Sequence, residues 1–274
     1  MMKLVAIDLD GTLLNHKNEI TDINKKALQQ LNQEGVKVVI ATGRSLISAR
    51  EIFQFLDIDG YILTLNGALI KEEKSNKTIF SKQLPKDALI KTLEIGFQEE
   101  ATVFFNTEEK NYRIPYTGNG ELVQEFQKIR GDVEELTFEK MREILENNTP
   151  RVLKAAFTSE NRQQLRKIQR IMNQANYYPV FSDKHYIEMM DEGVNKGTSL
   201  KRLCDYLEIE QKDVVAFGDQ ENDLQMIEFA GLGIAMENAA DKLKQAANEV
   251  IGTNRESAVG RRIIALLSTQ GLIG

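Results

Sequence analysis

Two carboxylates stand one residue apart in the segment Asp8-Leu9-Asp10-Gly11-Thr12, at the end of the apolar run Leu4–Leu9. Alternate residues of a strand point to the same face, so both side chains can enter one pocket at its carboxyl end. Open α/β sheets bind their ligands at that end. Two carboxylates this close repel each other unless a cation or a proton intervenes, which indicates Mg²⁺ or a shared proton. The structural alternative is an Asx-type turn after a buried strand.

Two further segments carry groups that suit an anion. Thr42-Gly43-Arg44 follows the apolar run Val36–Ala41 and combines a hydroxyl, a permissive backbone and a helix start, which together suit a phosphate oxygen. Lys196 precedes the helix that carries Leu200, where the helix dipole disfavours a cation. A neighbouring anion would resolve that conflict. Taken alone, Thr42-Gly43-Arg44 is better explained as an ordinary strand-to-helix turn, and Lys196 is explained equally well as a solvated surface lysine.

A second acidic segment follows the predicted strand Val214–Phe217. It contains Asp219 and Asp223, which are four residues apart and therefore face the same site once a helix begins. Between them, Asn222 can donate to a phosphate oxygen through its amide. The structural alternative is an N-cap role for Asp219 or Asn222.

Calcium loops do not account for either acidic segment. Leu13 and Leu224 occupy the positions where such a loop requires glycine, and Ala230 stands where the second requires glutamate. The four segments instead supply a nucleophilic carboxylate, a hydroxyl, an ammonium group and metal carboxylates at separate strand ends. Their conjunction favours a phosphoryl-transfer site over four unrelated structural roles.

Alternating strands and helices at both ends of the chain must position these groups. Near-continuous hydrophobic strands joined by helices predict a parallel sheet covered on both faces, which is a Rossmann-like α/β core. The predicted strands of this core are Leu4–Leu9, Val36–Ala41, Tyr61–Leu65, Val214–Phe217, Gly233–Met236 and a short one around Val250–Ile251.

The middle of the chain has a different, α+β pattern. Its predicted helices are Asp87–Gln98, Glu121–Lys128 and Asn161–Asn176, and its predicted strands are Thr102–Phe105, Val152–Phe157 and Tyr178–Phe181. About a hundred residues is too long for a loop and enough for a separate hydrophobic core. We therefore expect a core formed by 1–84 and 189–274, with an inserted domain at 85–188.

Composition narrows the class of partner. The chain is 42% hydrophobic and 28% charged with a net charge of −6, and it contains no run of five Lys or Arg residues. This argues against nucleic-acid and membrane-surface binding.

The sequence predicts neither a signal peptide nor a membrane span. Asp8 and Asp10 interrupt the N-terminal apolar run, and 263–274 is shorter than the ~20 residues of a membrane span. The single Cys204 excludes an intramolecular disulfide. These features predict a soluble, cytoplasmic protein, and they leave its oligomeric state open.

The four segments resemble the four motifs of the haloacid dehalogenase-like (HAD) superfamily of phosphatases. They occur in the order of that family: DLDGT, TGR, the lysine before a helix, and GDQEND. The insertion between TGR and Lys196 resembles a type C2 cap. Together with GIAMENA at 233–239, it is similar to the Cof-type (IIB) sugar-phosphatase branch. Arg255–Val259 departs from the acidic-Gly-Val pattern of that family but touches no motif position.

The resemblance implies a Mg²⁺-dependent hydrolase acting on a small phosphorylated metabolite such as a sugar phosphate. Asp8 would be the nucleophile that forms an aspartyl-phosphate, and Asp10 the general acid and base. Asp8, Asp219 and the Asp10 backbone carbonyl would bind Mg²⁺, with Asp223 in support. The groups expected to hold the phosphoryl oxygens are the Leu9 backbone amide, Thr42, Gly43, Lys196 and Asn222.

Two other functions fit part of this pattern. A phosphomutase would return the phosphoryl group from the same aspartyl-phosphate to a sugar instead of to water. A phospho-accepting receiver domain would keep the phosphoryl group as a signal. Asp10 argues against a receiver, because an acid/base group beside the phosphoaspartate hastens its hydrolysis, and a receiver has no use for the large insertion.

Overall fold

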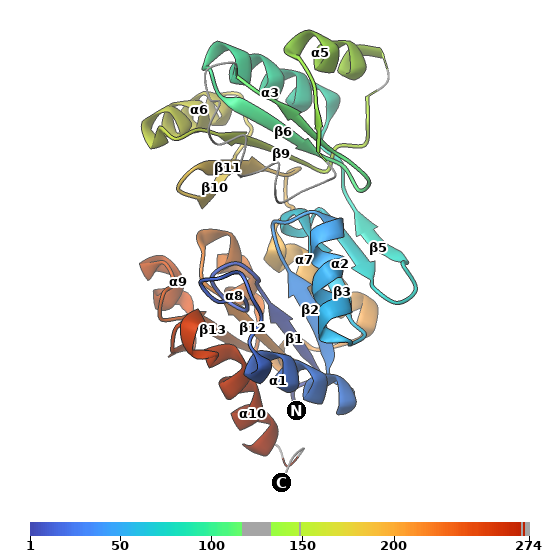
Figure 1. Ribbon diagram of the computed structural model, residues 1–274, viewed down its shortest axis with the longest axis vertical. Helices are drawn as coiled ribbons and strands as arrows, with labels where there is room; N and C mark the ends of the chain where they lie inside the picture. Colours follow the sequence, from blue (N-terminus) through green and yellow to red (C-terminus); the bar gives the residue numbers. More distant parts are fainter. Residues whose placement is uncertain (117–132, 148, 270, 272–274) are drawn as a thin grey trace. The chain divides into compact units, whose positions relative to one another are not determined.

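The computed structural model describes residues 1–116, 133–147, 149–269 and 271. The predicted helix Glu121–Lys128 lies outside these residues. The chain divides into two compact units, one formed by 1–80 and 194–274 and the other by 81–193. Each unit has its own sheet (Figure 1).

The first unit is built on an eight-stranded sheet of order β14-β13-β12-β1-β2-β3-β4-β5. The strands from β14 to β3 are parallel, and β4 pairs antiparallel with β3. Their bounds are β1 Leu4–Ile7, β2 Lys37–Ala41, β3 Tyr61–Thr64, β4 Leu69–Glu72, β5 Thr78–Ser81, β12 Val214–Gly218, β13 Leu232–Met236 and β14 Glu249–Ile251. Every residue of β1 is buried, as a strand covered on both faces requires.

Helices cover this sheet in two groups. Helix α1 packs on α2 and α10, and α7 packs on α8, which in turn contacts α9 (Figure 1). Their bounds are α1 Asp22–Gln33, α2 Leu46–Leu56, α7 Lys196–Leu207, α8 Leu224–Phe229, α9 Asp241–Ala246 and α10 Ala258–Thr269. Helix α1 is typical: the Thr21 side chain caps its first turn, and Ala27, Leu28 and Leu31 form its buried stripe.

The strand order of the first unit reverses at its centre. Strands β1 to β3 run outward in one direction, and β12 to β14 run outward in the other. Such a reversal is the switch point at which doubly wound sheets bind ligands, beyond the carboxyl ends of the two central strands. In this protein those strands are β1 and β12, which lead into Asp8 and Asp219.

The second unit is an α+β fold with a six-stranded sheet of order β10-β11-β9-β6-β7-β8. Helices α3, α5 and α6 share one hydrophobic core with the sheet, in which Leu89, Met141 and Leu165 accompany Phe105 and Phe157. The bounds are α3 Lys86–Gln98, β6 Thr102–Asn106, β7 Asn111–Ile114, β8 Val133–Glu135, α5 Phe138–Asn147, β9 Lys154–Thr158, α6 Arg162–Gln174, β10 Val180–Asp183 and β11 Tyr186–Met189.

The predicted fold class is confirmed, but several details differ. Leu84 and Met189, which we expected in the first unit, pack into the hydrophobic core of the second. The first strand is shorter than predicted, because it ends at Ile7 and not at Leu9. In the second unit, strands β7, β8 and β11 were not predicted. No helix in the described ranges is long and apolar enough to cross a bilayer.

Candidate active site

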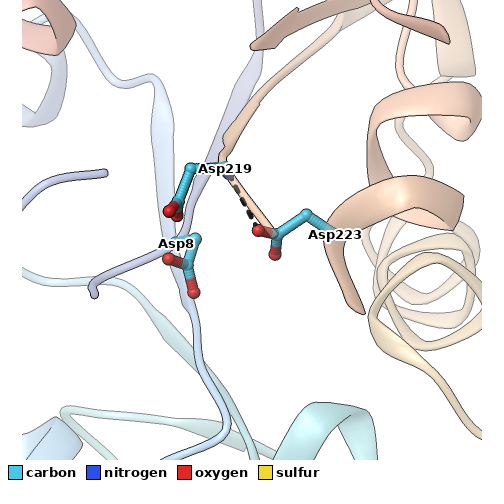
Figure 2. Close-up of side chains that lie close together, drawn as sticks. All are labelled: Asp8, Asp219 and Asp223. Carbon is cyan, nitrogen blue, oxygen red and sulfur yellow. Dashed lines mark hydrogen bonds between the residues drawn. The ribbon is translucent and has the colours of Figure 1, made fainter. Parts of the chain in front are cut away.

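The carboxylates of Asp8 and Asp219 lie side by side at the switch point of the first unit (Figure 2). Strands β1 and β12 pair in parallel with Ile7 opposite Phe217, so the chains that leave them are neighbours. The Asp8 amide continues this ladder by donating to the Phe217 carbonyl at 3.1 Å. Both aspartates are buried. Two residues 211 apart in sequence (219 − 8) are thus adjacent because of strand pairing alone.

Asp223 completes an acidic cluster from the turn that leads into α8. One carboxylate oxygen from each of Asp8, Asp219 and Asp223 lies within 4.8 Å of the other two. The Asp223 Oδ2 atom accepts from the backbone amides of Asp219 and Gln220, each at 3.0 Å, and Figure 2 draws the first of these bonds. Asp223 therefore shapes the turn after β12 as well as adding charge.

Hydrogen bonds from two neighbours orient Asp219. Thr12 donates from Oγ1 to Asp219 Oδ1 at 2.9 Å, and Gln220 donates from Nε2 to Oδ2 at 3.1 Å. Burial and the nearby Asp223 carboxylate nevertheless raise the pKa of Asp219 to about 7. The fixed carboxylate is thus costly to ionise without a further cation.

Lys196 is fully buried and is the first residue of α7. Its Nζ donates to Asp8 Oδ1 and to Asp223 Oδ1, both at 2.6 Å. Burial alone would lower the pKa of Lys196, but the carboxylates of Asp223 and Asp8 outweigh it and raise the pKa above its ordinary value. The carboxylates of Asp8 and Asp223 therefore supply the neighbouring anions that we expected beside Lys196.

The charges of the cluster do not balance. Three buried carboxylates face one ammonium group, so full ionisation leaves a charge of about −2 in a site of low dielectric. Burial is the main cause that raises the pKa of Asp8 well above its ordinary value; Lys196 opposes this and Asp223 adds to it. A hard divalent cation with oxygen ligands, such as Mg²⁺, fits this donor set and would remove the imbalance.

The structure does not bring the Asp10 carboxylate into this cluster. Its side chain is 54% exposed and forms a bidentate ion pair with Arg44, whose Nε donates to Asp10 Oδ2 at 2.8 Å. The alternation argument failed for Asp10 because β1 ends at Ile7 and the chain turns before residue 10. Arg44 was missed as a partner, although its charge within Thr42-Gly43-Arg44 was the available signal.

The predicted phosphate-binding residues lie at neighbouring strand ends. Thr42 is buried just after β2, and its Oγ1 accepts from the Arg44 amide at 3.1 Å, which fixes Gly43 between them in the turn toward α2. Leu9 is buried, and its carbonyl accepts from the Leu14 amide at 2.9 Å, which tightens the turn after Asp8.

Asn222 makes a contact that the sequence did not indicate. Its Nδ2 donates to Asn66 Oδ1 at 3.1 Å, whereas its own buried Oδ1 has no hydrogen-bond partner among the described residues. Asn66 follows β3 and was missed entirely. The Asn66-Gly67 dipeptide, a frequent turn signal, was the only hint.

Gly11 leaves room for Asp219, so we expect Gly11→Ala to destabilise the protein by about 2–5 kcal/mol. Gly11 has a φ of +86°, and an added Cβ would lie 2.2 Å from Asp219 Oδ2. Gly35→Ala is the matched control, since Gly35 has a φ of +76° and nothing within 4 Å of its Cβ position. Its expected cost is about 1–2 kcal/mol from the backbone alone. Urea unfolding of both variants measures the difference. Equal losses of stability would show that the Asp219 side chain moves away from the added Cβ without destabilising the protein.

The chain is similar to known proteins over almost its whole length. A family profile described as haloacid dehalogenase-like hydrolase matches residues 5–263. A Bacillus subtilis 5-amino-6-(5-phospho-D-ribitylamino)uracil phosphatase is 30% identical, over 96% of this chain and 94% of that protein. A solved haloacid dehalogenase-like hydrolase from B. subtilis superposes with a TM-score of 0.86 at 28% identity, covering 97% of this chain and 100% of that one.

A more distant solved structure shares the fold. It is described as a HAD subclass IIB sugar phosphatase and superposes with a TM-score of 0.83 at 20% identity, covering 99% of this chain and 100% of that one. The similarity therefore extends over both units of the chain and includes the inserted α+β segment.

Proposed function

The chain belongs to the haloacid dehalogenase-like hydrolases, a family of enzymes, and from that premise we propose that it is a Mg²⁺-dependent phosphatase of small phosphomonoesters. The observation that carries the proposal is the buried Asp8 carboxylate, held by Lys196 and adjacent to Asp219 at the switch point of the sheet. A carboxylate in that place can attack a phosphoryl group that the neighbouring strand ends bind.

Asp8 would act as the nucleophile. Its attack on the phosphorus forms an aspartyl-phosphate and expels the alcohol, and water then hydrolyses the intermediate to inorganic phosphate. Division of one difficult displacement into two easier ones is the benefit of covalent catalysis. The hydrogen bond from Lys196 to Asp8 Oδ1 orients the carboxylate before substrate arrives.

Asp10 would donate a proton to the leaving alkoxide and later accept one from the attacking water. Arg44 donates to both oxygens of the ionised Asp10 carboxylate, which orients Asp10 for its role as base, whereas proton donation would need one of these oxygens protonated and released from Arg44. The proton that Asp10 gives to the alcohol in the first step is replaced by the one it takes from water in the second, and its half-exposed carboxylate is open to that water.

The remaining motif residues would bind the phosphoryl group. The Thr42 hydroxyl, the amides of Leu9 and Gly43, the Asn222 carboxamide and the Lys196 ammonium are donors to oxygens whose charge is redistributed in the transition state. The 85–188 insertion would serve as a cap that reads the rest of the substrate and excludes bulk water.

Asp8, Asp219 and the Asp10 carbonyl would hold Mg²⁺, and Asp223 would orient them. When bound, the ion supplies positive charge that lets an anionic nucleophile approach an anionic phosphate. The supporting role of Asp223 agrees with its bonds, because its two oxygens already accept from Lys196 and from two backbone amides.

The proposed substrate class is a metabolite with phosphate on a sugar-derived carbon chain. The relative that is 30% identical is named for such a substrate, a phosphoribityl compound. A phosphomutase would share the aspartyl-phosphate, so hydrolysis has to be distinguished from transfer.

A screen of small phosphate esters with and without Mg²⁺ tests the proposal. We expect Mg²⁺-dependent release of inorganic phosphate from several sugar phosphates. Interconversion of hexose 6-phosphate and 1-phosphate without phosphate release would identify a mutase instead. A stable phosphoprotein after acetyl-phosphate treatment, without multiple turnover, would identify a receiver.

Without Mg²⁺, we expect the free energy of unfolding to fall as pH rises from about 5 to about 7. Burial raises the folded-state pKa of Asp219 to about 7 from an ordinary 3.8, so the folded protein holds a proton that the unfolded chain has released. Stability is then highest at low pH and is lost as pH rises through the folded pKa, at about 1.4 kcal/mol per unit for one proton.

Saturating Mg²⁺ should flatten this profile, because the ion favours the ionised carboxylate. Urea unfolding at several pH values in EDTA and in MgCl₂ measures both curves. Asp219→Asn is the control and should reduce the slope in EDTA, leaving the part that comes from Asp8, whose pKa burial also raises. Identical slopes with and without Mg²⁺ would contradict a metal site at Asp219.

A further inference from the structure

Three consecutive residues after β3 adopt a left-handed backbone. Leu65, Asn66 and Gly67 have φ values of +52°, +55° and +98°. This conformation is costly for residues other than glycine, and a bulky leucine adopts it rarely. Such strain persists only where the surrounding structure holds it. We refer to Leu65–Gly67 as the crossing loop.

The crossing loop is bound to the turn that contains Thr42 and Arg44. The Asn66 amide donates to the Thr42 carbonyl at 3.1 Å, and the Leu65 amide donates to the Arg44 carbonyl at 3.2 Å. The Thr64 hydroxyl also donates to the Arg44 carbonyl. The left-handed backbone thus aims successive amides at the carbonyls of the proposed phosphate-binding turn.

The crossing loop is also bound to the start of α7. Ser199 Oγ donates to the Gly67 carbonyl at 2.7 Å. A Cβ at Gly67 would lie 2.6 Å from the carbonyl oxygen of Asn195, the N-cap residue immediately before Lys196. The close approach fixes the spacing between this loop and the helix turn that carries the buried lysine.

The Asn66 side chain supplies the third link. The residue is 1% exposed, and its Oδ1 accepts from Asn222 Nδ2 at 3.1 Å. A carboxamide nitrogen carries two protons, so this bond orients the Asn222 amide plane and leaves the second proton for another acceptor. Asn66 therefore joins the elements that carry Thr42, Lys196 and Asn222.

We propose that Asn66 is a positioning residue of the phosphoryl site, acting through Asn222. The inference rests on the proposed phosphatase function, in which Asn222 donates to a phosphoryl oxygen. Without the Asn66 carboxamide, the Asn222 amide rotates among orientations of which only one donates to the phosphate. A phosphate-binding group that is present but wrongly oriented lowers the rate of the reaction.

A double-mutant cycle tests this role. Asn66→Gly removes the carboxamide and keeps the left-handed backbone, and it is made in the wild-type and Asn222→Ala proteins. Asn76→Gly is the control, since Asn76 has the same φ of +55° but lies exposed in the turn between β4 and β5. The measurements are kcat and KM for a hydrolysed ester, the calorimetric affinity for inorganic phosphate in Mg²⁺, and the urea midpoint.

We expect Asn66→Gly to lower kcat/KM and phosphate affinity by about tenfold or more in the wild-type background, and by less than about threefold with Asn222→Ala. Asn76→Gly should leave both unchanged. Equal fold losses in the two backgrounds, or no loss in wild type, would overturn the inference. If the wild type hydrolyses no ester, the proposed function fails, and the phosphate-affinity cycle alone decides the role of Asn66. A wild type that binds no phosphate overturns the inference as well.

Discussion

Asp8→Asn is expected to lower phosphate-ester turnover by roughly 10⁴-fold or more, which is the scale on which loss of a nucleophile acts. A carboxamide is nearly the same size as a carboxylate but does not attack phosphorus. Its oxygen can still accept the hydrogen bond that Lys196 now gives to Asp8 Oδ1, so the fold should persist. Multiple-turnover release of inorganic phosphate measures the effect, and urea unfolding verifies the fold.

Asp213→Asn is the matched control for this prediction. Asp213 is another buried aspartate of the first unit, but its carboxylate pairs with Lys3 and the N-terminal amine and not with the site. Its activity should equal that of wild type. Acid quenching during turnover should trap labelled phosphoprotein in wild type and none in Asp8→Asn. Near-normal turnover by Asp8→Asn would eliminate the aspartyl-phosphate mechanism.

Lys196→Met is expected to lower the free energy of unfolding by about 3–5 kcal/mol. It should also lower the turnover of phosphate esters. The ammonium is fully buried between Asp8 and Asp223. Its removal leaves three buried carboxylates without their cation, and the methionine restores the volume but not the charge. Urea unfolding in EDTA measures the loss, and Mg²⁺ should recover part of it.

Two variants make this prediction sharp. Lys201→Met changes a lysine of the same helix that is 60% exposed and pairs with Asp205, so its cost should stay within about 0.5 kcal/mol. Asp223→Asn added to Lys196→Met removes one uncompensated charge and should regain stability. A Lys196→Met protein as stable as Lys201→Met would mean that the cluster is not ionised in the folded state.

The parts of the site predictable from sequence are those that strand ends determine. Asp8 and Asp219 follow buried parallel strands, and any sheet that places β1 beside β12 brings them together. Asp10 could not be placed in this way, because its position depends on the turn at Gly11 and on the ion pair with Arg44. Asn66 could not be predicted for a related reason: contacts with Thr42 and α7, distant in sequence, hold the left-handed backbone of its loop.

The second unit shows the same limit. Its long helices α3 and α6 were predicted, because their buried residues recur at helical spacing. Helix α5 was missed, since Met141 and Leu145 are the only two of its ten residues that are buried. Strand β8 was also missed: it contains Glu134 and Glu135, and its pairing with β7 decides their conformation. Edge strands with exposed acidic side chains carry little hydrophobic pattern.

The division of the first sheet between the two ends of the chain has a consequence for folding. Thr12 and Asp219 hydrogen-bond across 207 residues, so the central strand pair closes a very long loop. During synthesis, β1 to β3 emerge long before β12, so the apolar side chains of β1 to β3 stay exposed until β12 has been made. The contiguous second unit can acquire its own core in that interval. High contact order therefore predicts that the first unit, which carries the candidate active site, is the last and slowest part to form.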